Sequence, residues 1–341
     1  MRTLLWSYLG WRRFPRDMSA FEVRHFFSFS VADRRELRVR YPRRLRLGAA
    51  LQLGFVRMTG TTLDGFGYVP NTVLRHVANA LALPAPDIAT LRALYRSEKT
   101  LFAHQAWAWK LAGFHWVETI DITAVVDALV AGTAVTLDRH RLARQAREEL
   151  YARRCLIPRD RDIEDWARRA IQLVENEDRR YLDSMVYMRQ RDSWLPALLR
   201  ETHPRPLTVL EWIRRPPRKR SKKTLQEELG KLLTIYTLCP PTLTPGIPVS
   251  RLRAYARRMQ RRRPIKVREI AEPRRTLEVG ALLSVLATRQ SDTVLLWSAF
   301  FRSRRSMPAR SRYGIINLRV CYVRSAPCAS RIVAGYLALG P

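Results

Sequence analysis

Apolar residues recur at intervals of three and four along most of this chain, whereas strict alternation of apolar and polar residues is rare. That spacing lines up apolar side chains along one face of an α-helix and does not fit the two-residue period of a strand. The clearest case runs from Arg43 to Gly60, where the apolar stripe comprises Leu47, Leu51, Phe55 and Met58. The sequence therefore predicts a mainly α fold, built as several small helical domains in series.

Capping patterns mark where several of these helices begin. Ser30 and Asp33 form a capping box, which predicts a helix from Ser30 to about Arg40, ended by the following Tyr41-Pro42. The same reasoning predicts further helices over residues 70–83, 87–96, 98–113, 138–154 and 160–191, one after Asp121, one opened by a capping box at 224–227 and running to about 238, and one after Ser250.

Charge is the unusual property of the composition. Lys and Arg number 62 against 30 Asp and Glu, which gives a formal net charge of +32. A GC-rich genome would explain why Arg outnumbers Lys, but it would not explain the shortage of acids. A surface this basic attracts nucleic acid or an anionic membrane, and the uneven distribution of the charge favours nucleic acid. Because no targeting segment or long uncharged apolar run is evident, we expect a cytoplasmic, nucleoid-associated bacterial protein without a membrane helix.

The basic excess is concentrated between residues 205 and 275, where 20 basic and 5 acidic residues give a net charge of 20 − 5 = +15. Within this region, residues 214–223 combine basic residues with two prolines and no acid. Such a segment is either an extended arm suited to a DNA minor groove or a flexible charged linker. The helix after Ser250 would carry arginines on every side except its apolar stripe, and these repel one another unless phosphates neutralise them.

We therefore expect two groups of DNA contacts in this region. They are Arg214, Arg215, Arg218, Lys219, Arg220, Lys222 and Lys223 of the arm, and Arg251, Arg253, Arg257, Arg258, Arg261, Arg262 and Arg263 of the helix.

A third candidate contact lies at the start of the helix after Pro42. Arg43, Arg44 and Arg46 crowd a helix N-terminus, where positive charge opposes the macrodipole, so that bound phosphate would offset the cost. Gln52 and Arg57 lie off the apolar stripe and join this candidate set. A solvated arginine cluster would give the same pattern.

The sequence predicts neither a metal site nor a catalytic site. The thiols of Cys155, Cys239, Cys321 and Cys328 lack C-x-x-C spacing and have no His or Cys at ligand spacing, so we expect them to be inert. The acids Asp160, Asp162, Glu164 and Asp165 open a predicted helix, where they suit the dipole rather than catalysis. Phosphate-loop, dinucleotide-binding and zinc-protease motifs are absent.

The end of the chain has a different composition. The 49 residues after Asp292 contain eight Arg but no Asp, Glu or Lys. The helical rhythm is also lost, so residues 303–341 are expected to form an irregular tail, produced by a frameshift or by loss of the true continuation.

Several segments carry a family resemblance. Residues 46–60 read R-L-G-x-A-x-Q-L-x-x-x-R-x-x-G, and residues 69–83 and 94–114 supply the next helices, with Tyr95, Arg96, Glu98, Thr100 and His104 at matching places. Residues 210–238 and 273–296 extend the match. Together these segments, over about residues 15–300, resemble the N-terminal part of the large replicative transposases of the Tn-three family.

The resemblance implies helical domains that grip the terminal inverted repeats of a transposon. The D-D-E catalytic core of such transposases, of RNase H type with Mg²⁺, lies far downstream of these segments, so this chain is expected to be an N-terminal fragment without cofactor or strand-transfer activity. We expect sequence-specific binding to double-stranded transposon ends. Two alternatives stay open: a regulatory fragment that inhibits transposition by occupying ends or by joining full-length transposase, and a non-functional remnant.

The expected organisation follows from these patterns. It comprises an N-terminal helical DNA-binding domain at 1–117, a helical domain with one long helix at 118–204, a basic arm with a helical DNA-binding unit at 205–275, the start of a further helical region at 276–302, and the tail at 303–341, with basic proline-rich linkers between domains.

Overall fold

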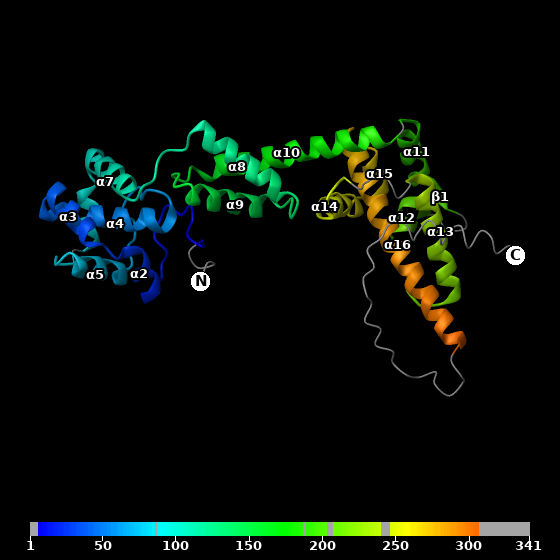
Figure 1. Cartoon of the computed structure of the whole chain (residues 1–341), viewed down its shortest axis with the longest axis horizontal. Coiled ribbons are helices and arrows are strands. Elements are labelled where there is room, and N and C mark those ends of the chain that lie inside the picture. Colours follow the sequence, from blue (N-terminus) through cyan, green and yellow to red (C-terminus); the bar gives the residue numbers. More distant parts are fainter. Residues whose placement is uncertain (1–5, 86, 187, 203–206, 240–245, 307–341) are drawn as a thin grey trace. The chain divides into compact units, whose positions relative to one another are not determined.

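A computed structural model describes residues 6–85, 87–186, 188–202, 207–239 and 246–306. These residues are helical almost throughout (Figure 1), and their strands form one short antiparallel pair, β1 (Glu201–Thr202) with β2 (Leu207–Thr208). The mainly α fold expected from the apolar period is confirmed. Within the described ranges, no helix is both long and apolar enough to cross a bilayer.

The chain forms two compact units, Met1–Leu173 and Val174–Pro341, which we call unit 1 and unit 2. Unit 1 contains α2 (Ala20–Phe27), α3 (Val31–Arg40), α4 (Arg43–Thr59), α5 (Asn71–Ala80), α6 (Ile88–Leu94), α7 (Glu98–Leu111), α8 (Thr119–Gly132), α9 (Arg139–Ala152) and the first half of α10 (Asp160–Met185). Unit 2 contains the rest of α10, α11 (Met188–Leu199), β1, β2, α12 (Val209–Arg214), α13 (Lys222–Leu238), α14 (Val249–Gln260), α15 (Pro264–Val267) and α16 (Arg274–Ser306).

Helix α4 is the centre of the first hydrophobic core of unit 1. It packs against α2, α3, α5 and α7, and every residue from Leu47 to Val56 is buried. Gly54 permits the close approach of α2, because a Cβ at this position would lie 2.2 Å from the Phe27 ring. A second core joins α8, α9 and the start of α10. The two cores draw on both ends of unit 1, since Leu9 belongs to the second core and Leu156 to the first, and the domain division expected from sequence stays a prediction.

Side-chain caps fix where the helices begin. At α3, Asp33 N–H donates to Ser30 Oγ (3.0 Å) and Ser30 N–H donates to the Asp33 carboxylate (2.9 Å), which confirms the expected capping box. At α13 the expected cap is wrong, because Ser221 rather than Thr224 is the capping residue. The helix therefore begins at Lys222.

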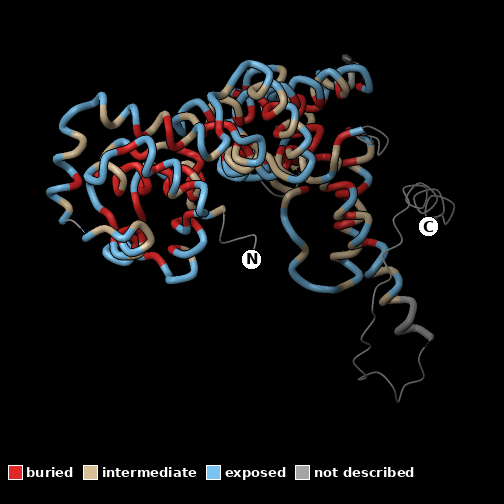
Figure 2. Tube along the Cα trace, turned by 60° about the vertical axis from the view of Figure 1, so that its left-hand side comes forward, coloured by how far each residue is buried: buried red, intermediate tan, exposed pale blue. Residues whose placement is uncertain are grey.

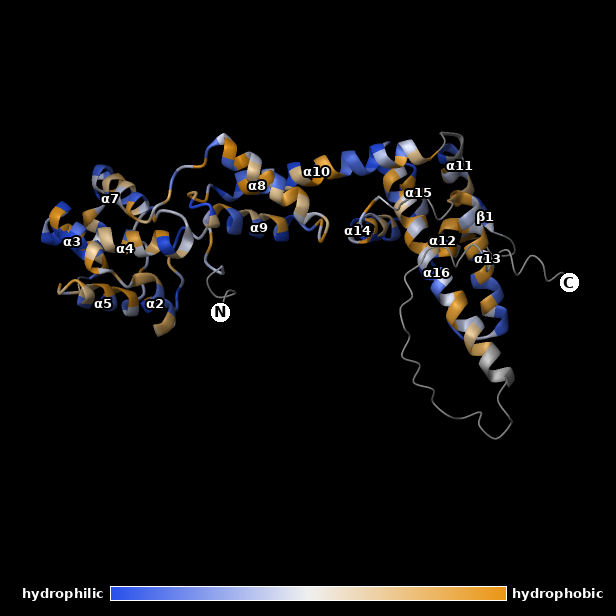
Figure 3. Ribbon diagram, in the orientation of Figure 1, coloured by the Kyte–Doolittle hydropathy of each residue, from blue (hydrophilic) through white to orange (hydrophobic). Residues whose placement is uncertain are grey.

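Unit 2 is built around α16, which packs against both α13 and α14. Its core gathers the apolar sides of these helices together with α11 and α12. Figure 2 shows that buried positions recur along individual helices, and Figure 3 shows that apolar residues are interspersed with polar ones along the same helices. The amphipathic period read from the sequence is the one that places these side chains in the core.

Three expectations about element boundaries need correction or fall outside the structure. The helix expected to reach Arg191 ends at Met185, and a separate helix, α11, follows it. At the start of the basic region 205–275, residues 209–214 form α12, which begins at a capping box formed by Thr208 and Glu211, so the expected arm is helical at Arg214. The regular helix α16 continues to Ser306, past the expected end of helix near Ser303, and the tail from 307 to 341 lies outside the described residues.

Candidate nucleic-acid interface

The seven arginines in and after α14 separate into two sets. One set faces carboxylates within unit 2: Arg251 lies 3.0 Å from Asp178, Arg258 lies 2.6 Å from Glu175, and Arg262 lies 3.3 Å from Glu278. These pairs tie α14 to α10 and α16. Their guanidinium charge is largely neutralised inside the protein, so they have little charge left for phosphate.

The second set points to solvent. Arg253, Arg257, Arg261 and Arg263 are exposed, and the ion pairs found among the described residues include none of them. Arg253, Arg257 and Arg261 follow one another at intervals of four, so they form a row along one face, with about 6 Å of helix rise between neighbours. We call these three residues the arginine row.

The opposite side of α14 explains why the row faces outward. Leu252, Tyr255, Ala256 and Met259 are buried, as their spacing predicts. Tyr255 is fully buried and its hydroxyl donates to Asp178 at 2.8 Å, and burial raises the pKa of this phenol. The helix is therefore held in one rotation about its axis, which leaves the arginine row in solvent.

The basic segment after α12 is fastened at its first residues. The Arg214 guanidinium is mostly buried and donates to the carbonyls of Arg262 (2.8 Å) and Met259 (2.5 Å), at the C-terminal end of α14. Burial lowers the pKa of Arg214 to about 10, which keeps the side chain charged at neutral pH. Lys231, itself buried against Glu228 (2.6 Å), donates to the Arg215 carbonyl at 2.8 Å.

This anchoring brings the two basic stretches of unit 2 together. The segment starts beside the C-terminal end of α14, next to the arginine row, although the two are about 40 positions apart in the sequence. The segment is shorter than the expected arm, because Arg214 belongs to α12 and α13 begins at Lys222. Its exposed basic residues, with those of the first turn of α13, are Arg215, Arg218, Lys219, Arg220, Lys222 and Lys223. Arg220 also lies over the Phe300 ring, 6.0 Å from its centroid.

The candidate contacts in unit 1 also have different environments. Arg43 and Arg44 are exposed at the N-terminus of α4, where no side chain caps the helix. Arg46 instead turns back to donate to the carbonyls of Tyr41 (2.9 Å) and Arg38 (3.3 Å). Arg43 and Arg44 are thus the two of this trio that are free to meet a phosphate.

Gln52 and Arg57 hold the fold of unit 1. Gln52 is fully buried, and its amide donates to the Leu63 carbonyl (2.7 Å) and accepts from the Leu63 N–H (3.1 Å). Arg57 donates to both carboxylate oxygens of Asp33, at 3.0 and 3.1 Å. Because these bonds occupy both side chains, neither residue is proposed as a DNA contact.

Helix α3 carries a basic face that sequence reasoning missed. Arg35 and Arg38 are exposed and Arg34 is partly exposed, and these three line a shallow hollow with Val31 and Val39. The two valines are unusually accessible, with exposed fractions of 76% and 79%. Guanidinium groups beside exposed methyl groups are the side chains that contact guanine and the thymine methyl group in a major groove. The signal in the sequence was two valines on the polar side of an amphipathic helix.

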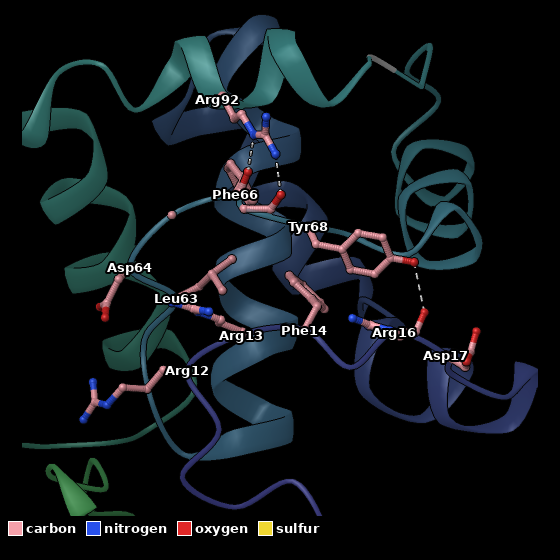
Figure 4. Close-up of a pocket in the computed structure, with 12 residues that line it drawn as sticks. Arg12, Arg13, Phe14, Arg16, Asp17, Leu63, Asp64, Phe66, Tyr68 and Arg92 are labelled. Atoms are coloured by element: carbon pink, nitrogen blue, oxygen red, sulfur yellow. Dashed lines mark hydrogen bonds between the residues drawn. The ribbon is translucent and has the colours of Figure 1, made fainter.

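A second arginine-rich site of unit 1 is an open pocket of about 1300 Å³ between residues 12–17 and the loop 63–68 (Figure 4). Arg92 holds the loop by donating to the carbonyls of Phe66 (2.9 Å) and Gly67 (2.5 Å), and Tyr68 donates to the Arg16 carbonyl (3.0 Å). Arg13 and Arg16 are exposed along its edge. The pocket therefore combines positive charge with aromatic surface. Its lining comes from segments far apart in the sequence, so the sequence pattern does not predict it.

The cysteines agree in part with expectation. Burial raises the pKa of the Cys155 and Cys239 thiols to about 12, so both are protonated at neutral pH when no metal is bound. The expectation that no His lies near a cysteine is wrong for Cys155, whose Sγ is 3.4 Å from His115 Nε2. Cys321 and Cys328 lie outside the described residues.

Comparison with known proteins adds two findings. Residues 9–170 match a family described as a domain of unknown function (DUF4158). The chain is also 34% identical over 293 residues to the transposase for insertion sequence element IS1071 in transposon Tn5271 of Comamonas testosteroni, an alignment that covers 85% of this chain and 30% of that transposase. The chain is thus a transposase-related protein that spans about 30% of the length of this relative.

Proposed function

We propose that this transposase-related chain binds double-stranded DNA at the terminal inverted repeats of a transposon, as the N-terminal region of a Tn-three-family transposase would. The observation that carries the proposal is the division of the α14 arginines. Three of them have carboxylate partners inside unit 2, whereas the arginine row has none among the described residues. Adjacent unpaired guanidinium groups repel one another, and a polyanion removes that cost.

Phosphate contacts in unit 2 come from the arginine row together with the basic residues of segment 215–223. Arg214 supports this assignment, because it fastens the start of the segment to the C-terminal end of α14. Contacts of this kind position a protein on DNA and provide affinity without reading sequence. The set of expected DNA-binding residues is therefore smaller than the full set of basic residues in this part of the chain.

Sequence reading is assigned to α3 of unit 1. Arg35 and Arg38 supply guanidinium forks, and Val31 and Val39 supply apolar contacts, all on one exposed face. Such a face suits base edges, because a bidentate contact between Arg and guanine discriminates against other bases by about 1–3 kcal/mol. Arg43 and Arg44, at the next helix N-terminus, are placed as supporting phosphate contacts.

The division of roles is testable by fluorescence anisotropy with two duplexes, one with the inverted repeat and one with the same bases scrambled. Replacing Arg35 and Arg38 with Ala should weaken binding to the repeat more than to the scrambled duplex. Replacing the arginine row with Ala should weaken binding to both equally. The assignment to α3 would be wrong if the first variant lost the same affinity for both duplexes.

A further inference from the structure

Three side chains of unit 1 with metal-ligand chemistry converge at one point. His115 Nε2 lies 3.4 Å from Cys155 Sγ and 3.4 Å from Asp121 Oδ2, and all three atoms lie within 4.8 Å of one another. Tetrahedral zinc bonds of about 2.0–2.3 Å place neighbouring ligand atoms about 3.3–3.6 Å apart. The two separations from His115 Nε2 fall within that range.

The backbone holds these three residues in place before any ligand binds. His115 N–H donates to the Arg154 carbonyl (2.9 Å) and Leu156 N–H donates to the His115 carbonyl (2.8 Å), so the chains at His115 and Cys155 run side by side. Asp121 sits in the first turn of α8, where its carboxylate also accepts the Glu118 N–H at 3.0 Å. Preorganised ligands of this kind reduce the cost of forming a metal site.

An unusual conformation delivers Cys155 to this point. Arg154 has φ +59°, a left-handed conformation that is unfavourable for a non-glycine residue. Helix α9 ends there in a Schellman motif, in which Cys155 N–H donates to the Leu150 carbonyl (2.9 Å) and Arg154 N–H to the Tyr151 carbonyl (3.0 Å). The Arg154 guanidinium lies over the Phe114 ring at 5.4 Å, which offsets part of the cost.

The geometry distinguishes a metal site from a catalytic triad. In a Cys–His–Asp triad the thiol and the carboxylate contact different ring nitrogens, so that the imidazole can pass a proton. Here both groups approach the same nitrogen, Nε2. Convergence of three ligand atoms on one point is instead what coordination of a single ion requires.

We propose that His115, Asp121 and Cys155 bind one Zn²⁺ ion, with water in the fourth position. A thiolate, an imidazole and a carboxylate form a ligand set that zinc accepts, and the thiol loses its proton on binding. The side chain of His115 is 48% exposed and that of Asp121 13%, which gives the ion a route from solvent, while Cys155 is fully buried. The ion would join the ends of α7 and α9 to the start of α8.

The sequence pattern does not indicate this site, because the expected metal motifs have ligand residues close together in the sequence. Asp121 is six residues from His115, whereas Cys155 is 40 residues away. The proposal does not depend on DNA binding, and either can fail without the other.

Cobalt(II) is the probe, because a thiolate ligand gives it a charge-transfer band that zinc lacks. The full chain carries Cys239→Ala, Cys321→Ser and Cys328→Ser, which leave Cys155 as the sole thiol. We expect a saturable band at one cobalt per chain, displaced by Zn²⁺, and a higher melting temperature with Zn²⁺. His115→Ala should weaken cobalt binding at least about 100-fold, because removing even an outer-shell partner costs 10–100-fold.

Two further variants make the result decisive. Asp121→Asn keeps an oxygen that can accept the Glu118 N–H, so it tests the carboxylate ligand with the helix cap preserved. His140→Ala, at an exposed histidine on α9, is the matched control and should bind cobalt normally. The proposal is overturned if no saturable thiolate band forms, or if the band keeps its affinity in both His115→Ala and Asp121→Asn.

Discussion

Replacing Arg253, Arg257 and Arg261 with Ala should flatten the salt dependence of DNA binding. Each phosphate contact contributes about 0.9 to the slope of log K against log salt, so three lost contacts lower the slope by about 2.7. Between 50 and 200 mM salt, wild type should therefore lose about 40-fold more affinity than the variant loses.

The structure predicts that this variant folds normally. All three side chains are exposed, none of them is in an ion pair seen in the described chain, and Ala is the best helix former. Stability should change by no more than about 0.5 kcal/mol, measured by urea denaturation. A loss of affinity with unchanged stability would then report the interface itself.

The assay is fluorescence anisotropy with one duplex at five or more salt concentrations. The matched control replaces Arg159, Arg161 and Arg169 with Ala; these arginines lie at the start of α10, are exposed, and are in no ion pair seen among the described residues. It removes the same charge and should leave the slope at its wild-type value. If the two triple variants have equal slopes, net charge governs binding and the assignment to the arginine row is refuted.

Three further outcomes are expected. Arg214→Ala should destabilise the chain by about 1–3 kcal/mol in urea, because it removes a mostly buried guanidinium that donates to the carbonyls of Arg262 and Met259. Arg215→Ala removes the same charge and should weaken DNA binding without loss of stability. Burial lowers the pKa of His104 to about 4, below its value in the unfolded chain, so the unfolded chain takes up the proton first as the pH falls. The free energy of unfolding should therefore fall by about 3 kcal/mol between pH 6.5 and pH 4. His104→Leu should remove most of this fall, and a variant with the same pH profile as wild type would contradict the assignment. Gly54→Ala should lower stability by about 1–3 kcal/mol, because its Cβ would overlap the Phe27 ring, and a melting temperature equal to wild type would show that α2 can move away.

Local patterns predicted helix starts and buried faces correctly where the stabilising contacts are themselves local. The capping box of Ser30 and Asp33 and the buried side of α14 depend on residues three or four positions apart, which periodicity captures. The cap of α13 was misplaced because Ser221 and Thr224 both precede a suitable helix. Propensity alone does not rank two neighbouring caps of this kind.

Pairing between residues far apart in the chain could not be predicted from the sequence. Nothing local indicates that Arg251 meets Asp178, 73 residues away, while Arg253 meets solvent. The same holds for Gln52, which lies off the apolar stripe and is nevertheless fully buried because Leu63 satisfies both ends of its amide. Charge composition thus located the basic region, but the fold decides which of its arginines are available to DNA.

Competition between two duplexes tests the central claim most directly. The full chain, bound to a labelled terminal inverted repeat at physiological salt, is challenged with unlabelled repeat or with unlabelled scrambled duplex. Specific DNA-binding proteins prefer their sites by about 10³-fold or more, and we predict a preference of that order for the repeat. Equal competition by both duplexes would show that the chain is a general polyanion binder and would contradict the account.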